Sequence, residues 1–226
     1  MTYLRFLLVS ISWLAHSIFA QSPVANFSAN PLVVCVGENV NFTNTSSPNG
    51  GPALSSYQWD FGDGNASTTT NTTHAFSTPG TFTITLVATN VNGIADAEIK
   101  PAYITVNPLP NVSFAANGLG CTVPLTLSFT NNSSQGANFS QSWNFGNGQT
   151  STQYAPQNIT YNSQGTFQAQ LTVTNNNTGC INSLTQPIVV SNFQAGITAP
   201  SVGCVGQAIL FEDNSTIGAN TWNWNF

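Results

Sequence analysis

An internal repeat constrains the fold most strongly, because a motif that recurs at a fixed spacing marks structural units of similar length. The stretch YQWDFGDG at residue 57 returns as QSWNFGNG at 141 and as TWNWNF at 221. Its tryptophans, Trp59, Trp143 and Trp224, are 84 and 81 residues apart. The flanking stretches repeat in step, since GTFTITLVATN at 80 matches GTFQAQLTVTN at 165. We therefore expect modules of about 80 to 87 residues.

Within each repeat, apolar and polar residues alternate. Phe82, Ile84 and Leu86 alternate with threonines, which is the pattern of a half-buried β-strand. Turn-forming stretches such as SPNGG, GDGN and STPG separate the strand segments. Several short strands in about 85 residues predict an antiparallel, immunoglobulin-like β-sandwich. The predicted fold class is all-β, with such sandwiches in tandem.

The N-terminal segment has the pattern of a secretory signal. Residues 1–20 combine Arg5, an apolar run and Ala20 as the small residue before a cleavage site. A membrane anchor is the weaker alternative, because serines and His16 interrupt a run that is short for a span. We predict a cleaved signal peptide and a secreted or cell-surface location.

The repeats divide the remaining chain into modules. The first is expected at residues 21–109 and the second at residues 110–192. Residues 193–226 resemble the start of a third module that stops before its second half. We therefore expect this chain to be the N-terminal part of a longer protein.

Charge is scarce, since only 4% of residues are charged, and the net charge is −5. Loss of Arg5 with the signal leaves Lys100 against seven acidic residues. An acidic chain without a basic cluster is poorly suited to nucleic acid or to an anionic membrane surface. The expected partners are extracellular proteins or glycans, with no membrane insertion after signal cleavage.

The four cysteines are expected to form disulfides rather than to bind metal, because the predicted compartment is oxidising and no CxxC pair exists. Cys121 and Cys180 lie in one module, and a bridge over about 60 residues would stabilise it by about 4 kcal/mol. We predict that these two pair. Cys35 has Ile94 where its partner would stand, and the partner of Cys204 would lie beyond the end of this chain. Cys35 and Cys204 are predicted to be unpaired.

The paired aspartates of the repeated motif suggest three roles: acid–base catalysis, cation binding or turn capping. Asp60 and Asp63 are replaced by Asn144 and Asn147 in the second copy. An amide cannot titrate, and it is a poorer calcium ligand than a carboxylate. Both residue types can accept a hydrogen bond from a backbone N–H two residues on. We predict turn capping in each copy and no catalytic residue; calcium at Asp60 and Asp63 is the weaker alternative, and no other cofactor is expected.

The aromatic and glycine residues of the motif are expected to be structural. Burying one such tryptophan contributes at most about 5 kcal/mol. The predicted structural residues are Trp59, Phe61, Gly62, Gly64, Trp143, Phe145, Gly146, Gly148 and Trp224.

Four further side chains leave a choice between packing and function. His74 is replaced by Ile159 in the second copy, which favours a packed position over a catalytic one. Tyr154, Tyr161 and Phe139 belong either to a core or to a sugar-stacking surface, and the core is the favoured alternative.

The motif WDFGDG, the step from His74 to Phe76 and the stretch PGTFTITLVATN together resemble the PKD domain. The resemblance covers two complete copies and one partial copy, although the second copy has Asn144, Asn147 and Ile159 at three motif positions. It implies a secreted or surface-displayed immunoglobulin-like sandwich that acts as a spacer or contacts proteins or glycans. It implies no catalytic residue.

The expected function is therefore a non-enzymatic structural or adhesive segment of a larger surface protein, such as an adhesin or a gliding-motility-associated protein. One alternative is an accessory region of a secreted protease or polysaccharide hydrolase whose catalytic domain lies beyond residue 226. Another is a carbohydrate-binding module.

Overall fold

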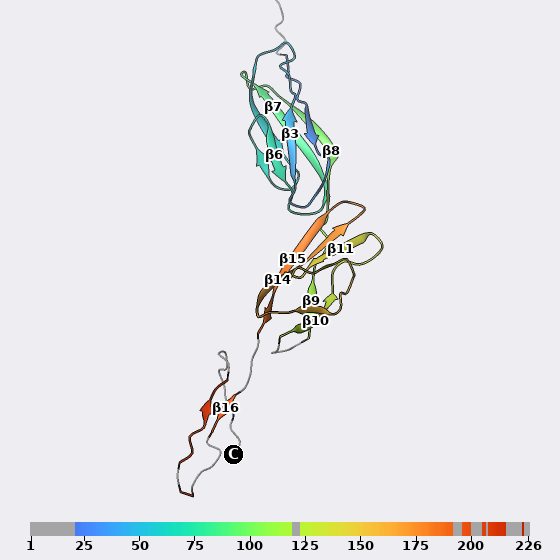
Figure 1. Cartoon of the computed structure of the whole chain (residues 1–226). Helices are drawn as coiled ribbons and strands as arrows, with labels where there is room; N and C mark the ends of the chain where they lie inside the picture. The colour runs from blue at the N-terminus through green and yellow to red at the C-terminus, as the bar shows by residue number, and fades with distance from the viewer. Residues whose placement is uncertain are drawn as a thin grey trace, which may run out of the picture. The chain divides into compact units, whose positions relative to one another are not determined.

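The computed structural model describes residues 21–118, 123–191, 196–199, 205–206, 208–215 and 223. The chain divides into two compact units, Met1–Asn107 and Pro108–Phe226. All secondary-structure elements in the described residues are β-strands, so the predicted all-β class is confirmed (Figure 1). The predicted signal peptide and Trp224 lie outside the described residues.

Unit 1 is a sandwich of two sheets. Its strands are β1 (Phe27–Asn30), β2 (Val33–Cys35), β3 (Asn39–Asn44), β4 (Leu54–Asp60), β5 (Ala66–Ser67), β6 (Thr72–Ala75), β7 (Gly80–Asn90) and β8 (Ala95–Asn107). One sheet has the order β1-β3-β6, and the other has the order β2-β8-β7-β4-β5. The pairings are antiparallel except that of β2 with the end of β8, which is parallel.

The core of unit 1 follows from the alternation in the sequence. Ile84 and Leu86 of β7 are buried, whereas Thr85 between them lies on the opposite face of the sheet. Trp59 of β4 is fully buried, and its ring meets those of Phe27 and Phe42 at centroid distances of 5.2 and 5.7 Å. These rings come from both sheets, so they fill the space between the two layers.

Unit 2 repeats this arrangement. Its strands are β9 (Phe114–Asn117), β10 (Leu125–Asn131), β11 (Phe139–Asn144), β12 (Thr150–Ser151), β13 (Ile159–Tyr161), β14 (Gly165–Asn175) and β15 (Ile181–Val190). The sheet orders are β13-β10-β9 and β12-β11-β14-β15. Trp143 is buried against Phe114 and Phe129, at 5.1 and 5.5 Å, as Trp59 is against its own phenylalanines.

The described part of residues 193–226 contains one short hairpin. Strands β16 (Ile197–Thr198) and β17 (Glu212–Asp213) pair antiparallel. The described residues contain no helix long and apolar enough to cross a membrane.

Candidate functional site

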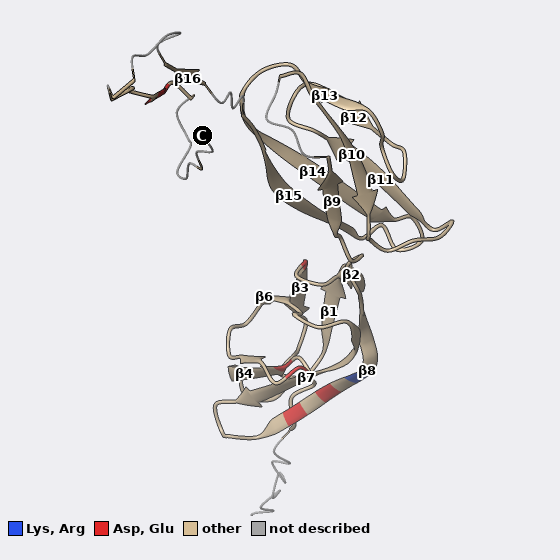
Figure 2. Cartoon of the chain, turned by 90° about the horizontal axis from the view of Figure 1, so that it is seen from below, with Lys and Arg blue, Asp and Glu red and all other residues tan. Residues whose placement is uncertain are grey.

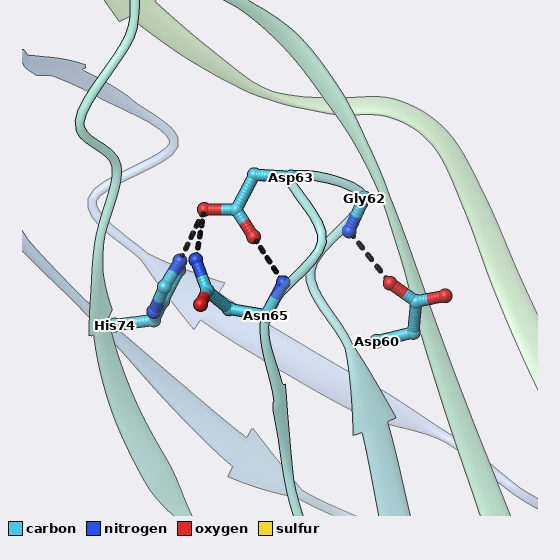
Figure 3. A network of polar contacts seen from close by, with 5 residues as sticks. All are labelled: Asp60, Gly62, Asp63, Asn65 and His74. Atoms are coloured by element: carbon cyan, nitrogen blue, oxygen red, sulfur yellow. Dashed lines mark hydrogen bonds and ion pairs between the residues drawn. The ribbon is translucent and has the colours of Figure 1, made fainter.

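The candidate site of unit 1 is the turn that follows β4, where the repeated motif places both aspartates (Figure 3). The Gly62 N–H donates to Asp60 Oδ1 at 2.8 Å, and the Asn65 N–H donates to Asp63 Oδ1 at 3.0 Å. Each carboxylate thus accepts from the backbone two residues further on, which is the capping arrangement expected from the sequence. The Phe61 N–H donates to the Asn65 carbonyl at 3.2 Å and closes the turn.

Gly62 is required by this turn for two reasons. Its φ is +74°, in the left-handed region that side chains resist. A Cβ at this position would lie 2.5 Å from the carbonyl oxygen of Thr83 on β7. The turn is therefore pressed against the neighbouring strand, and only glycine fits there.

Asp63 also makes a contact that the sequence comparison did not predict. His74 Nε2 lies 2.7 Å from Asp63 Oδ2, and only 14% and 7% of the two side chains are exposed. The imidazole of His74 stacks on Phe61, with centroids 4.1 Å apart and planes inclined by 8°. His74 is thus packed, as predicted, and it additionally joins β6 to the turn.

The environment of Asp63 acts on its pKa in two directions. Burial raises the pKa of the carboxyl, whereas hydrogen bonds from His74 and Asn65, together with the charge of His74, lower it. The net pKa is below its ordinary value of 3.8. Asp63 is therefore held ionised, so it is not poised to donate or accept a proton near neutral pH.

Unit 2 builds the same turn with amides. Asn144 Oδ1 accepts from the Gly146 N–H, and Asn147 Oδ1 accepts from the Gln149 N–H, both at 3.0 Å. Instead of contacting an imidazole, Asn147 Nδ2 donates to the Thr160 carbonyl at 2.9 Å. The capping geometry is therefore kept without any carboxylate.

The strand register also places His74 and Ile159 at equivalent positions. His74 pairs with Val40 on β3, and Ile159 pairs with Leu127 on β10. Phe76 lies two residues after His74, and the buried Tyr161 lies two residues after Ile159. Phe76 and Tyr161 therefore occupy equivalent positions in the two units. A hydrophobic side chain thus replaces His74 where an amide replaces Asp63.

Hydrogen bonds engage both carboxylate oxygens of Asp63 and one carboxylate oxygen, Oδ1, of Asp60. Asp63 Oδ1 accepts from the Asn65 N–H, while Asp63 Oδ2 faces Asn65 Nδ2 at 3.1 Å and His74 Nε2. No group of three or more His, Cys, Asp or Glu side chains placed to hold a metal ion occurs in the described part of the chain. The geometry supports a structural turn, and calcium at Asp60 and Asp63 stays a hypothesis.

In each unit the buried tryptophan donates a hydrogen bond to the segment that follows the turn. Trp59 Nε1 donates to the Thr69 carbonyl at 2.9 Å, and Trp143 Nε1 donates to the Gln153 carbonyl at 3.0 Å. The bonds are equivalent, because each spans ten residues from the motif tryptophan. Phe61 and Phe145 are buried in the same cores as these indoles.

The three aromatic residues of uncertain role, Tyr161, Phe139 and Tyr154, differ in how deeply they are buried. Tyr161 is fully buried, and its hydroxyl donates to the Phe145 carbonyl at 3.0 Å. Burial raises the pKa of Tyr161 to about 12. Phe139 packs against the core of unit 2, whereas Tyr154 is 37% exposed and donates from its hydroxyl to the Asn131 carbonyl. Tyr161 and Phe139 are therefore core residues rather than a sugar-stacking surface.

One cysteine prediction requires correction. Cys35 and Cys180 are both disulfide-bonded, so the predicted unpaired Cys35 is wrong. The predicted Cys121–Cys180 pair and the predicted unpaired Cys204 stay predictions. Cys121 and Cys204 lie outside the described residues.

The sequence comparison also gave no role to Lys100 of β8. Its ammonium donates to the Phe27 carbonyl and lies 4.5 and 5.0 Å from the ring centroids of Phe27 and Tyr103. Lys100 is the sole Lys or Arg in the described part of the chain, and it is engaged inside unit 1. In Figure 2 the coloured charges are few, and several of them lie along β8.

Parts of this chain are similar in sequence to parts of bacterial proteases. It is 36% identical over 89 residues to Collagenase ColA of Clostridium perfringens, a match that covers 36% of this chain and 8% of the relative. Microbial collagenase of Vibrio alginolyticus is 35% identical over 81 residues, covering 33% and 10%. Pre-pro-metalloprotease PrtV of Vibrio cholerae is 33% identical over 128 residues, covering 56% and 13%. The matched stretches span only about a tenth of the length of these relatives.

Solved structures are similar over single units. The PKD1 domain of the Vibrio cholerae metalloprotease PrtV is 32% identical and covers 38% of this chain and 98% of its own, with a TM-score of 0.33. The PKD1 domain of Vibrio anguillarum Epp is 28% identical and covers 39% and 99%, with a TM-score of 0.34.

Family models identify both repeats. A PKD domain model matches residues 20–106, and a second PKD domain model matches residues 111–186. The two matches cover unit 1 and most of the strands of unit 2. They include the turns that follow Trp59 and Trp143, which we call the tryptophan turns. The chain belongs to the PKD domain family and carries two PKD domains in tandem.

Proposed function

We propose that this chain is a non-catalytic, extracellular accessory region in which tandem PKD domains act as spacers and contact proteins or glycans. One observation carries the non-catalytic part of the proposal. The turn of unit 2 keeps its capping bonds with Asn144 and Asn147 in place of Asp60 and Asp63. A role that survives the loss of both carboxylates does not depend on proton transfer.

The comparisons support the accessory part of the proposal. The similar stretches make up 8 to 13% of proteins named as collagenases and a metalloprotease. A short stretch that is shared among large proteases, and that consists here of PKD domains, is better suited to positioning than to hydrolysis. By the same analogy we place the mature chain outside the cell, consistent with the signal-like residues 1–20.

A role as an adhesive segment of a surface protein is compatible with the same spacer geometry. No contact in the described residues favours it over the protease-associated role. The protease-associated role is therefore the preferred form of the proposal.

Two measurements test the proposal. The full chain is expressed in a secreting bacterial host, and the exported protein is expected to begin at or near Gln21, as read by N-terminal sequencing. The purified protein is then incubated with casein and with gelatin, and no cleavage is expected. Retention inside the cell, or proteolysis that copurifies with the chain and is lost in an unfolded control, would refute the proposal.

A further inference from the structure

A groove lined mostly by residues with hydroxyl or amide side chains lies on unit 1. It has a volume of about 410 Å³. Its floor lies on β4 and β7, where Ser56 pairs with Thr89 and Gln58 pairs with Val87. Its wall is the segment after β5, which contributes Thr68 and Thr70. Ser55 and Tyr57 complete the lining. We name this cavity the β4 groove and call the first six residues its groove residues.

The floor of the β4 groove is on the outer face of the five-stranded sheet. Trp59, Leu86 and Ala88 alternate with the floor residues and are buried in the core. Side chains of neighbouring strand residues point to opposite faces, so Gln58 and Val87 project away from the core. A ligand in the groove would therefore contact side chains that the fold does not need for packing.

The wall is held by bonds from the interior. Thr69, between the two wall residues, accepts a hydrogen bond from Trp59 Nε1 at 2.9 Å, and its hydroxyl donates to the Asn71 carbonyl at 2.8 Å. The adjacent strand β5 pairs with Trp59 and Asp60. The groove is consequently pre-formed, which reduces the conformational entropy lost on binding.

The polar groups of the groove are available to a ligand. Within the described part of the chain, the side chains of Gln58, Thr68 and Thr70 make no hydrogen bond. The same holds for the side chains of Ser56 and Thr89, although the backbone carbonyl of Thr89 accepts from Ser55 Oγ at 3.0 Å. Four hydroxyls and one amide thus face solvent without protein partners.

The chemistry of the lining selects among ligand classes. None of the six groove residues is charged, and Lys100 is engaged with Phe27. An anionic or cationic ligand would find no countercharge, whereas sugar hydroxyls pair with neutral hydroxyls and amides. The apolar surface of Val87 suits the C–H face of a sugar ring.

From these observations we infer that the β4 groove binds a neutral saccharide. The inference rests on the proposed function, because it names one ligand class for a region proposed to contact proteins or glycans. It places the contact on unit 1 and assigns Gln58 and Thr89 as the residues that donate and accept hydrogen bonds.

The inference is tested on the full mature chain labelled with ¹⁵N. The probes are cellohexaose, chitohexaose and mannohexaose as neutral saccharides, with trigalacturonate as an acidic one. At least one neutral probe is expected to shift the amide signals of β4, β7 and residues 68–70, and trigalacturonate is expected to shift none of them.

Three variants assign the effect to the groove. Gln58→Ala and Thr89→Val each remove a single hydrogen-bonding group, so each should weaken binding about fivefold. The matched control is Ser142→Ala, because Ser142 precedes Trp143 on β11 as Gln58 precedes Trp59 on β4. This control should bind as the parent does. Signals outside the groove report whether each variant is folded.

Gelatin peptides are added as a separate probe. Three outcomes would overturn the inference: unmoved groove signals with every saccharide, equal binding by the parent and both groove variants, or groove shifts produced by gelatin peptides and by no saccharide. The last outcome would assign the groove to a peptide. The proposed function is judged separately, since a chain that is exported and non-proteolytic retains it even if no saccharide binds.

Discussion

At the residue scale, the tryptophan turn depends on oxygen position rather than on charge. Asp60 and Asn144 place Oδ1 at 2.8 and 3.0 Å from the glycine N–H that each one caps. Comparison of the internal copies anticipated this, because both residue types share that acceptor. The Asp63–His74 contact was not anticipated, since it joins residues on different elements and has no counterpart in the second copy.

The two glycines of the first turn are expected to differ in their tolerance of alanine. Gly62→Ala should destabilise unit 1 by about 3 kcal/mol, because its Cβ would meet the Thr83 carbonyl oxygen at 2.5 Å. Gly64 has a φ of +91° but no atom within 4 Å of an added Cβ, so Gly64→Ala should cost about 1 kcal/mol. Hydrogen exchange of the buried β7 amides measures both costs. Equal costs would contradict the proposed clash.

The lowered pKa of Asp63 predicts a loss of stability in acid. Its carboxylate contributes fully above its ordinary pKa of 3.8, and this contribution is lost as pH falls through the lower folded value. Asp63→Asn should destabilise unit 1 by about 1 kcal/mol at pH 7 and reduce the further loss between pH 5 and pH 2. Asp60→Asn is the control, since it leaves His74 and Asp63 in contact. If Asp63→Asn loses as much stability between pH 5 and pH 2 as the parent does, Asp63 does not have this role.

Chelation provides a separate test of the first turn. We expect the melting temperature of the chain to be unchanged by an excess of EDTA, because both oxygens of Asp63 already accept hydrogen bonds. Addition of millimolar calcium should likewise have no effect. A drop of several degrees on chelation, restored by calcium and absent in Asp63→Asn, would instead establish a calcium site.

At the scale of strands and sheets, the period-two pattern predicted β7 and its counterpart β14, because each has one buried face. The long strand β8 was not predicted. It carries Asp96, Glu98 and Lys100, and Pro101 follows where its pairing with β7 shifts between Phe82 and Ile84. Polar residues and a proline obscure the alternation, so this strand is recognised only once its partner is in place.

Buried Tyr161 predicts an alkaline transition in unit 2. Because its pKa is raised to about 12, the folded state keeps the phenol proton that the unfolded chain loses near its ordinary pKa of 10. Stability should therefore fall between pH 10 and pH 12. Tyr161→Phe should remove this part of the pH dependence while costing about 1 kcal/mol at pH 7 through loss of the bond to the Phe145 carbonyl.

Brief incubations between pH 10 and pH 12, followed by near-ultraviolet circular dichroism, measure this loss of stability. Phe76, at the equivalent position of unit 1, shows that phenylalanine fits there. If parent and Tyr161→Phe lose structure at the same alkaline pH, then Tyr161 is not the titrating group.

At the scale of the whole molecule, the bonding state of Cys35 is the feature that the sequence comparison assigned incorrectly. A chymotryptic digest made without reductant should contain Cys35 in a disulfide-linked peptide, which reductant separates. Recovery of Cys35 as a free thiol from the denatured, non-reduced protein would restore the original sequence prediction.

The repeat spacing, the all-β class, the buried tryptophans and the capped turns could be predicted from the sequence alone. Each depends on local alternation or on groups within a few residues of one another, so a continuous stretch of the chain carries the information. The Asp63–His74 contact, the disulfide-bonded state of Cys35 and the β4 groove became evident only in the three-dimensional structure. These features depend on residues that are far apart in the chain and on which side chains face outward, and strand pairing determines both.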